Sequence, residues 1–188
     1  VGRVTAGVKR TAVGLSEIRG AFRIATLHAD APRMQMRALN WLLSTPNDPC
    51  SFDGAVIVIN PKSGAFEIST AGDVGAALIV SPGKPKALRI PDSPAVGNGQ
   101  SIEYKGGTGK IGDGETLVLF SAGTTAAKDE SGDELGERRL LEAISDGFGQ
   151  SADTLMADVA ADLAAYLKNP AAPDDITILL ANRPAQAG

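Results

Sequence analysis

Helical and strand patterns are segregated along the chain, and this order predicts an α+β domain built as a sandwich of antiparallel sheets with helices on its outer faces. Two helical segments come first, a block of strands follows, and two further helices precede a last strand. Strands and helices therefore do not alternate as repeated βαβ units would require. The length of 188 residues fits one domain, and 43% apolar residues supply a core that needs no disulfide or metal to hold it.

Apolar residues recur at three- and four-residue steps in four segments, which predicts helices there. The predicted helices are Thr11–His28, Pro32–Ser44, Glu134–Ile144 and Ser151–Leu167. Pro32 suits a first-turn position and marks the start of the second helix. Phe22 and Trp41 lie in the first two segments, and we expect both to belong to the core.

Runs of β-branched and apolar residues separated by Gly/Pro turns predict the strands. They are 53–60, 65–70, 76–80, 87–90, 101–104, 116–121 and 176–181. Turn residues at 61–64 join the first two as a β-hairpin. The glycine-rich stretch 106–109 lacks the Lys-Ser/Thr and helix start of a phosphate loop, so we expect a loop or hairpin tip.

Charge and composition exclude several classes of protein. The net charge is −4, but residues 1–45 carry seven basic and two acidic side chains, and the rest of the chain carries 11 basic and 20 acidic ones. The basic residues are not interleaved with aromatics, which make up only 4% of the chain, so nucleic-acid binding is not predicted. The single cysteine, Cys50, excludes an internal disulfide and a Cys-rich zinc site, and we expect it to be a bystander.

No apolar run approaches the roughly 18 residues of a membrane helix, and no signal peptide is visible at the N-terminus. We therefore expect a cytoplasmic domain without a membrane segment. Val1 is not expected to be the natural start of the protein.

Three short segments carry the chemistry of a possible site. They are Thr70–Asp73, Phe120–Thr125 and Pro173–Thr177, and each combines a strand end with turn residues. Carboxylates at strand ends hold hard cations such as Mg²⁺ or Mn²⁺. Each segment alone is more typical of a turn or a cap than of a ligand set.

Together these segments resemble one family, the SpoIIE/RsbU branch of the PPM (type-2C) serine/threonine protein phosphatases. The resemblance extends from Gly2 to about Arg183. Its strongest piece is GETLVLFSAGTTAA (114–127), similar to GD-x-L-x-L-Y/F-S/T-D-G-V-T-E-A; the others are DESGDELGERRL (129–140), DDIT (174–177), STAGD (69–73) and GRVTAGV (2–8). The resemblance implies an α-β-β-α sandwich flanked by helix pairs, with a domain at 1–183 and a tail at 184–188. Family domains carry an N-terminal hairpin before the first motif, and we expect it to be absent here, because the chain begins at that motif.

The resemblance also implies a two-metal site, and the departures fall on it. In active members, aspartates hold two Mg²⁺ or Mn²⁺ ions, whose bridging water attacks the phosphoserine phosphorus. Those aspartates correspond to Arg3, Ala122 and Asp174 here, so only Asp174 is retained. Asp175, and Asp73 where the family has His, are further candidate ligands.

These departures lead us to expect a pseudophosphatase, used in bacterial signalling as a regulatory protein-binding module. No cofactor is then expected, and the resemblance implies as partner a STAS-type anti-sigma-factor antagonist or a linked sensor domain. Arg3 is expected to pair with Asp174 and Asp175, offsetting their charge in place of a metal.

Two alternatives remain open. One is an active Mg²⁺- or Mn²⁺-dependent phosphatase with a site rebuilt from Asp73, Asp174 and Asp175, with Asp53 as a further carboxylate. The other is a metal-free phosphoprotein reader, in which Arg3, Lys9 or Arg10 grips the phosphate. His28 has no Cys or second His near it in the sequence and is expected at a helix end or on the surface.

Overall fold

The structure, a computed structural model, describes residues 2–5, 11–44, 51–82, 84–88, 90–99, 101–167 and 175–184, with only the backbone described at 2–5 and 11–12. The chain divides into two compact units. Unit 1 comprises Val1–Val74 and Arg89–Gly109, and unit 2 comprises Gly75–Leu88 and Lys110–Gly188. The single domain expected at 1–183 stays a prediction.

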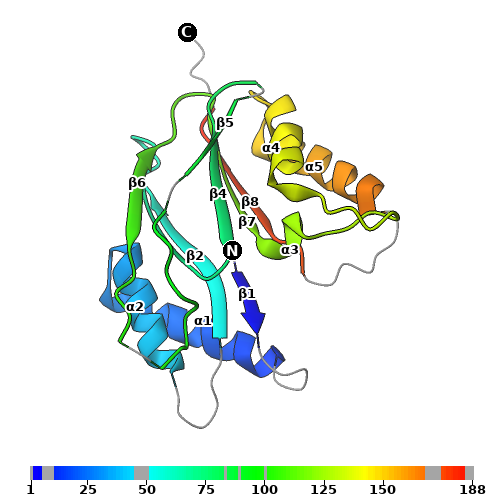
Figure 1. The fold of residues 1–188 in the computed structure, drawn as a ribbon. Coiled ribbons are helices and arrows are strands. Elements are labelled where there is room, and N and C mark those ends of the chain that lie inside the picture. Colours follow the sequence, from blue (N-terminus) through cyan, green and yellow to red (C-terminus); the bar gives the residue numbers. More distant parts are fainter. Residues whose placement is uncertain are drawn as a thin grey trace. The chain divides into compact units, whose positions relative to one another are not determined.

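Unit 1 is built on a sheet with strand order β1-β2-β3-β6 (Figure 1). The strands are β1 (Gly2–Thr5), β2 (Ser51–Ile59), β3 (Ala65–Ala71) and β6 (Gly106–Lys110). Strands β2 and β3 pair antiparallel, from Gly54 opposite Ala71 to Ile59 opposite Phe66. The Asn60 side chain accepts the N–H groups of Lys62 and Ser63 and so closes the predicted hairpin.

Two helices complete unit 1, and both follow the predicted bounds. Helix α1 spans Thr11–His28, and α2 spans Pro32–Leu43 with Pro32 in its first turn. They pack with the sheet and the 96–104 loop around one core, formed by Ile18, Ala21, Ala25, Met36, Leu39, Leu43, Val56, Ala71, Val96 and Tyr104. The expectation for Trp41 and Phe22 was wrong, because Trp41 is 78% exposed and Phe22 is 38% exposed on the outer sides of their helices.

The last strand of unit 1 lies later than predicted. Residues 101–104 form no strand, and β6 begins at Gly106, within the stretch expected to be a loop tip. A Cβ atom at Gly109 would lie 2.4 Å from the Phe66 ring, and one at Gly106 would lie 3.0 Å from the Ile68 carbonyl oxygen. Close approach of β3 therefore explains why this strand is rich in glycine.

Unit 2 is built on a sheet with strand order β5-β4-β7-β8. Its strands are β4 (Val74–Ile79), β5 (Pro85–Ala87), β7 (Thr116–Ser121) and β8 (Ile178–Asn182). All lie at or within a few residues of the predicted strands, and β7 matches its prediction at both ends. Gly75 leaves room for the Phe120 ring, whose nearest atom would lie 2.1 Å from a Cβ atom there.

The helices of unit 2 are the one-turn α3 (Ala122–Thr125), α4 (Gly136–Asp146) and α5 (Ala152–Leu167). Ser151 caps α5, because its hydroxyl accepts the N–H of Thr154. The longer two pack with the sheet around a second core, which includes Ala77, Ile79, Val118, Phe120, Leu140, Ile144, Leu155 and Val159. None of the helices in the described residues is long and apolar enough to cross a membrane.

Candidate functional site

Two of the sequence motifs meet in unit 2, where β7 ends and β8 begins. The Ser121 hydroxyl accepts the N–H of Thr177 at 3.2 Å and donates to the carbonyl oxygen of Asp175 at 3.3 Å. The Thr124 hydroxyl donates to the carbonyl oxygen of Thr177 at 3.2 Å, and the Ser121 N–H donates to the same oxygen at 3.0 Å. Ser121 and Thr124 are buried, so these bonds fix the 175–177 segment beside α3.

Position 122 is held at this junction. Ala122 is the first residue of α3 and is half-buried. Its methyl group provides no oxygen, so the side chain cannot serve as a metal ligand. Asp175 lies at the same junction and is exposed, whereas Asp174 lies outside the described residues.

The candidate residues Arg3, Asp53 and Asp73 lie in unit 1, around the paired ends of β1, β2 and β3. Strands β1 and β2 pair antiparallel, and the register places Arg3 directly opposite Asp53. The Asp53 carboxylate reaches across to Gly72, where an added Cβ atom would lie 1.8 Å from Asp53 Oδ1. Gly72 has a φ of +66°, and Asp73 follows it as an exposed turn residue between β3 and β4.

Asp53 was a further candidate carboxylate of the rebuilt metal site, and it begins the strand predicted at 53–60. In the structure it lies inside β2, with its carboxylate beside Gly72. The glycine at position 72, whose missing side chain leaves space for the carboxylate, is the sequence signal for this contact.

The remaining candidate residues are not placed with these carboxylates by the structure. Lys9, Arg10 and Cys50 lie outside the described residues. His28 is the exposed last residue of α1, as predicted. Among the residues that the structure describes, no group of three or more His, Cys, Asp and Glu side chains could hold a metal ion.

The family is decided by sequence comparison. The profile of the family described as Stage II sporulation protein E (SpoIIE) matches residues 9–184, nearly the whole chain. The chain belongs to the SpoIIE family. No curated protein sequence matches this SpoIIE-family chain.

Solved structures show that the SpoIIE-family chain has the PP2C fold. The SiaA-PP2C domain of Pseudomonas aeruginosa matches with a TM-score of 0.80 at 20% identity, over 96% of this chain and 74% of that one. The RsbU and RsbW domains of a Mycobacterium tuberculosis protein match with a TM-score of 0.76 at 18% identity, over 100% of this chain and 53% of that one. The catalytic domain of the serine threonine protein phosphatase PstP, in complex with 2 manganese ions, matches with a TM-score of 0.64 at 14% identity, over 96% and 85%. These matches confirm the predicted α+β fold of the PPM phosphatases.

Proposed function

We propose that this SpoIIE-family domain does not catalyse metal-dependent dephosphorylation and acts as a regulatory protein-binding module in bacterial signalling. The observation that carries the proposal is the alanine at position 122. Hydrogen bonds from Ser121 and Thr124 to the 175–177 segment hold this position where the family motif has a metal-binding aspartate.

The residues at the motif positions do not fit the two metal ions of active relatives. Divalent cations such as Mg²⁺ and Mn²⁺ are bound through oxygen ligands, several of them anionic. Position 122 offers no oxygen, and position 3 carries a cation that would repel a metal ion. Asp174 and Asp175 would be the remaining carboxylates, with Asp73 as a further candidate.

Arg3 has an acidic neighbour within its own unit. The expected pairing with Asp174 and Asp175 stays a prediction, because Asp174 is outside the described residues and Asp175 belongs to the other unit. Asp53, in contrast, is the cross-strand partner of Arg3. Oppositely charged residues at directly paired positions stabilise a sheet, so we include Asp53 as the counter-charge of Arg3 in this proposal.

The partner in this proposal is a protein, either a STAS-type anti-sigma-factor antagonist or a linked sensor domain, and its setting is stress-response regulation in the cytoplasm. The joint presence of RsbU and RsbW domains in one of the matching structures supports a regulatory role of this kind. The chain spans about half of that matching protein chain.

The decisive experiment is a calorimetric Mn²⁺ titration of the domain, with Asp174→Ala as the control. We expect no binding heat at millimolar Mn²⁺. Micromolar binding that is lost in Asp174→Ala would instead support the rebuilt metal site and an active phosphatase. A gain-of-function variant, Arg3→Asp with Ala122→Asp, is expected to acquire Mn²⁺ binding, because it restores the aspartates that the family motifs have at both positions.

The phosphoprotein-reader alternative gives a different result. Phosphoserine-peptide binding that survives EDTA and is lost in Arg3→Ala would favour it. Absence of such binding leaves the regulatory module as the supported function.

A further inference from the structure

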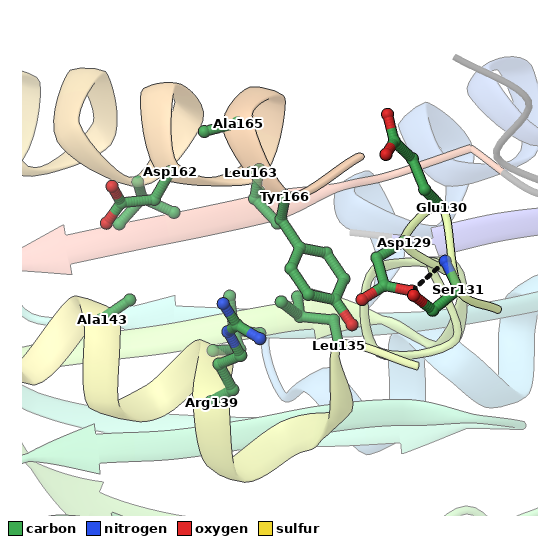
Figure 2. A pocket seen from close by; sticks show the side chains of 12 residues that line it. Asp129, Glu130, Ser131, Leu135, Arg139, Ala143, Asp162, Leu163, Ala165 and Tyr166 are labelled. Atoms are coloured by element: carbon green, nitrogen blue, oxygen red, sulfur yellow. Dashed lines mark hydrogen bonds between the residues drawn. The ribbon is translucent and has the colours of Figure 1, made fainter. Parts of the chain in front are cut away.

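Unit 2 contains a cavity of about 580 Å³ between helices α4 and α5 and the loop at 129–131 (Figure 2). We call it the α4–α5 pocket. Its volume is in the range of ligand sites in proteins. Its lining includes neither position 122 nor residues 175–177, so it is distinct from that junction. Six of its lining residues belong to the sequence motif at 129–140.

The base of the pocket is apolar. Leu135, Leu140 and Val159 line it and are buried in the second core, and Leu163 is half-buried beside them. Figure 2 shows Leu163 projecting from α5 and Leu135 lying below the Tyr166 ring. An apolar side chain that enters here would displace water from the exposed parts of Leu163 and Tyr166, which are half-buried, and this favours binding.

One wall of the pocket is held in a fixed arrangement. The Arg139 guanidinium lies 4.4 Å from the centre of the Tyr166 ring, and the Tyr166 hydroxyl donates to the carbonyl oxygen of Asp133 at 2.7 Å. The Asp129 carboxylate accepts the N–H groups of Ser131 and Asp133 at 2.8 and 3.0 Å. The stack and the loop bonds order the wall before any ligand arrives, and this lowers the entropy cost of binding.

The rim of the pocket is acidic. Asp129, Glu130 and Asp162 contribute three carboxylates against the single cation of Arg139. Within the described residues, Glu130 and Asp162 have no ion-pair partner. The surrounding segment 128–167 carries ten acidic and three basic side chains, a net charge of −7. The pKa of Tyr166 is raised by desolvation and by the Asp129 and Asp133 carboxylates, against the opposing effect of Arg139.

We propose that the α4–α5 pocket binds a basic peptide segment of a partner protein, with an apolar side chain of the peptide in the pocket and flanking Lys or Arg residues on the acidic rim. Charge complementarity selects this occupant, because an acidic peptide or a nucleic acid would meet the same carboxylates with like charge. The proposal goes beyond the loss of catalysis, since it names a second site and does not depend on metal at the first.

The experiment measures fluorescence polarisation of short labelled peptides with the full chain in EDTA, so that metal binding plays no part. The first peptide has a central Leu-Leu pair flanked by Arg and Lys. One control peptide has Glu and Asp flanks, and another keeps the basic flanks around a Ser-Ser centre. We expect only the first to bind, with an affinity that falls as ionic strength rises.

Charge-reversal variants locate the site. Glu130→Lys combined with Asp162→Lys is expected to weaken binding at least about tenfold. The control is Asp158→Lys, because Asp158 is an exposed carboxylate on the same helix as Asp162 and is outside the pocket lining. It is expected to change binding less than about twofold. These side chains are on the surface, so circular dichroism should show the same folded state for all of them.

A second pair of variants tests the apolar base. Ala143→Phe fills the pocket and is expected to abolish binding, whereas Ala157→Phe, on exposed α5 surface outside the lining, is expected to retain it. If Ala143→Phe fails to fold, the charge-reversal comparison alone decides.

Three outcomes overturn the proposal. They are failure of the basic Leu-Leu peptide to bind, equal binding of the Ser-Ser peptide, and equal loss of binding in Asp158→Lys and the rim variant. Self-association of the chain that is lost in the rim variant would overturn the choice of a foreign partner in favour of a second copy.

Discussion

Replacement of Gly72 by alanine tests the local geometry around Asp53. Gly72 has a φ of +66°, a conformation that costs a residue with a side chain about 1–2 kcal/mol. Its Cβ atom would also lie 1.8 Å from Asp53 Oδ1 and 2.4 Å from Asp53 Cγ, far inside van der Waals contact. The carboxylate must then rotate away from its present position, at a cost of about 0.5–1.5 kcal/mol.

The two costs together predict that Gly72→Ala destabilises the protein by about 1.5–3.5 kcal/mol. For a chain of this length, that corresponds to a fall in Tm of about 3–14 °C. The measurement is urea and thermal unfolding followed by circular dichroism.

Two comparisons separate the backbone cost from the steric one. Gly99→Ala is the matched control, because Gly99 has a φ of +71° but no atom within 4 Å of an added Cβ. It should cost only the backbone part, about 1–2 kcal/mol. In an Asp53→Gly background, which also removes the Asp53 Cβ atom at 2.9 Å from the added one, Gly72→Ala should fall to the same value. Equal costs for Gly72→Ala with and without Asp53 would refute the reasoning, as would a cost no larger than that of Gly99→Ala.

Three further predictions follow from buried polar groups. Asn40→Ala should destabilise unit 1 by about 1–3 kcal/mol in urea unfolding, because the buried Asn40 Oδ1 accepts both backbone N–H groups of the 97–98 turn. A loss of stability below about 0.5 kcal/mol would contradict this prediction. Burial raises the pKa of Tyr104 to about 12, above the unfolded value of about 10. The stability that the protonated Tyr104 contributes is therefore complete below about pH 10 and is lost as pH rises through about 12. Tyr104→Phe should reduce this loss of stability at high pH. An unchanged dependence of unfolding on pH in the variant would contradict the prediction. Ser121→Ala should speed amide hydrogen exchange in the 175–177 segment, since it removes the acceptor of the Thr177 N–H, and unchanged exchange would show that the hydroxyl does not hold the segment.

Sequence patterns predicted those helices and strands in which the spacing of apolar residues matches the residues that are buried. Helix α1 and strand β7 have the predicted bounds. Helix α1 buries Ile18, Ala21 and Ala25 at three- and four-residue steps, and every residue of β7 is buried. Strand β6 was missed because Gly106 and Gly109 oppose strand propensity and are required only by the neighbouring β3. Trp41 was assigned to the core on its residue type, yet α2 already buries Met36, Leu39 and Leu43 on another face.

The candidate site could be predicted in parts. The motifs at 120–125 and 174–177 were identified from sequence, and hydrogen bonds join the described part of the second to the first. The contact between Asp53 and Gly72 needed the register of β2 against β3, which a one-residue shift would alter. The stack of Arg139 on Tyr166 joins two helices, and nothing in either helical pattern indicates such a contact.

The path of the chain through the two units has a consequence for biosynthesis. Neither unit is a continuous segment, because unit 1 takes up residues 89–109 after unit 2 has begun, and unit 2 resumes at residue 110. A ribosome adds about 5–20 residues per second. The sheet of unit 1 is therefore complete only after β6 has been synthesised, and the sheet of unit 2 only after β8, close to the end of the described chain. Neither unit can therefore complete its sheet early in synthesis. A ribosome that stalls within α5 would leave the edge of β7 in the second sheet exposed, because its partner β8 has not yet been made.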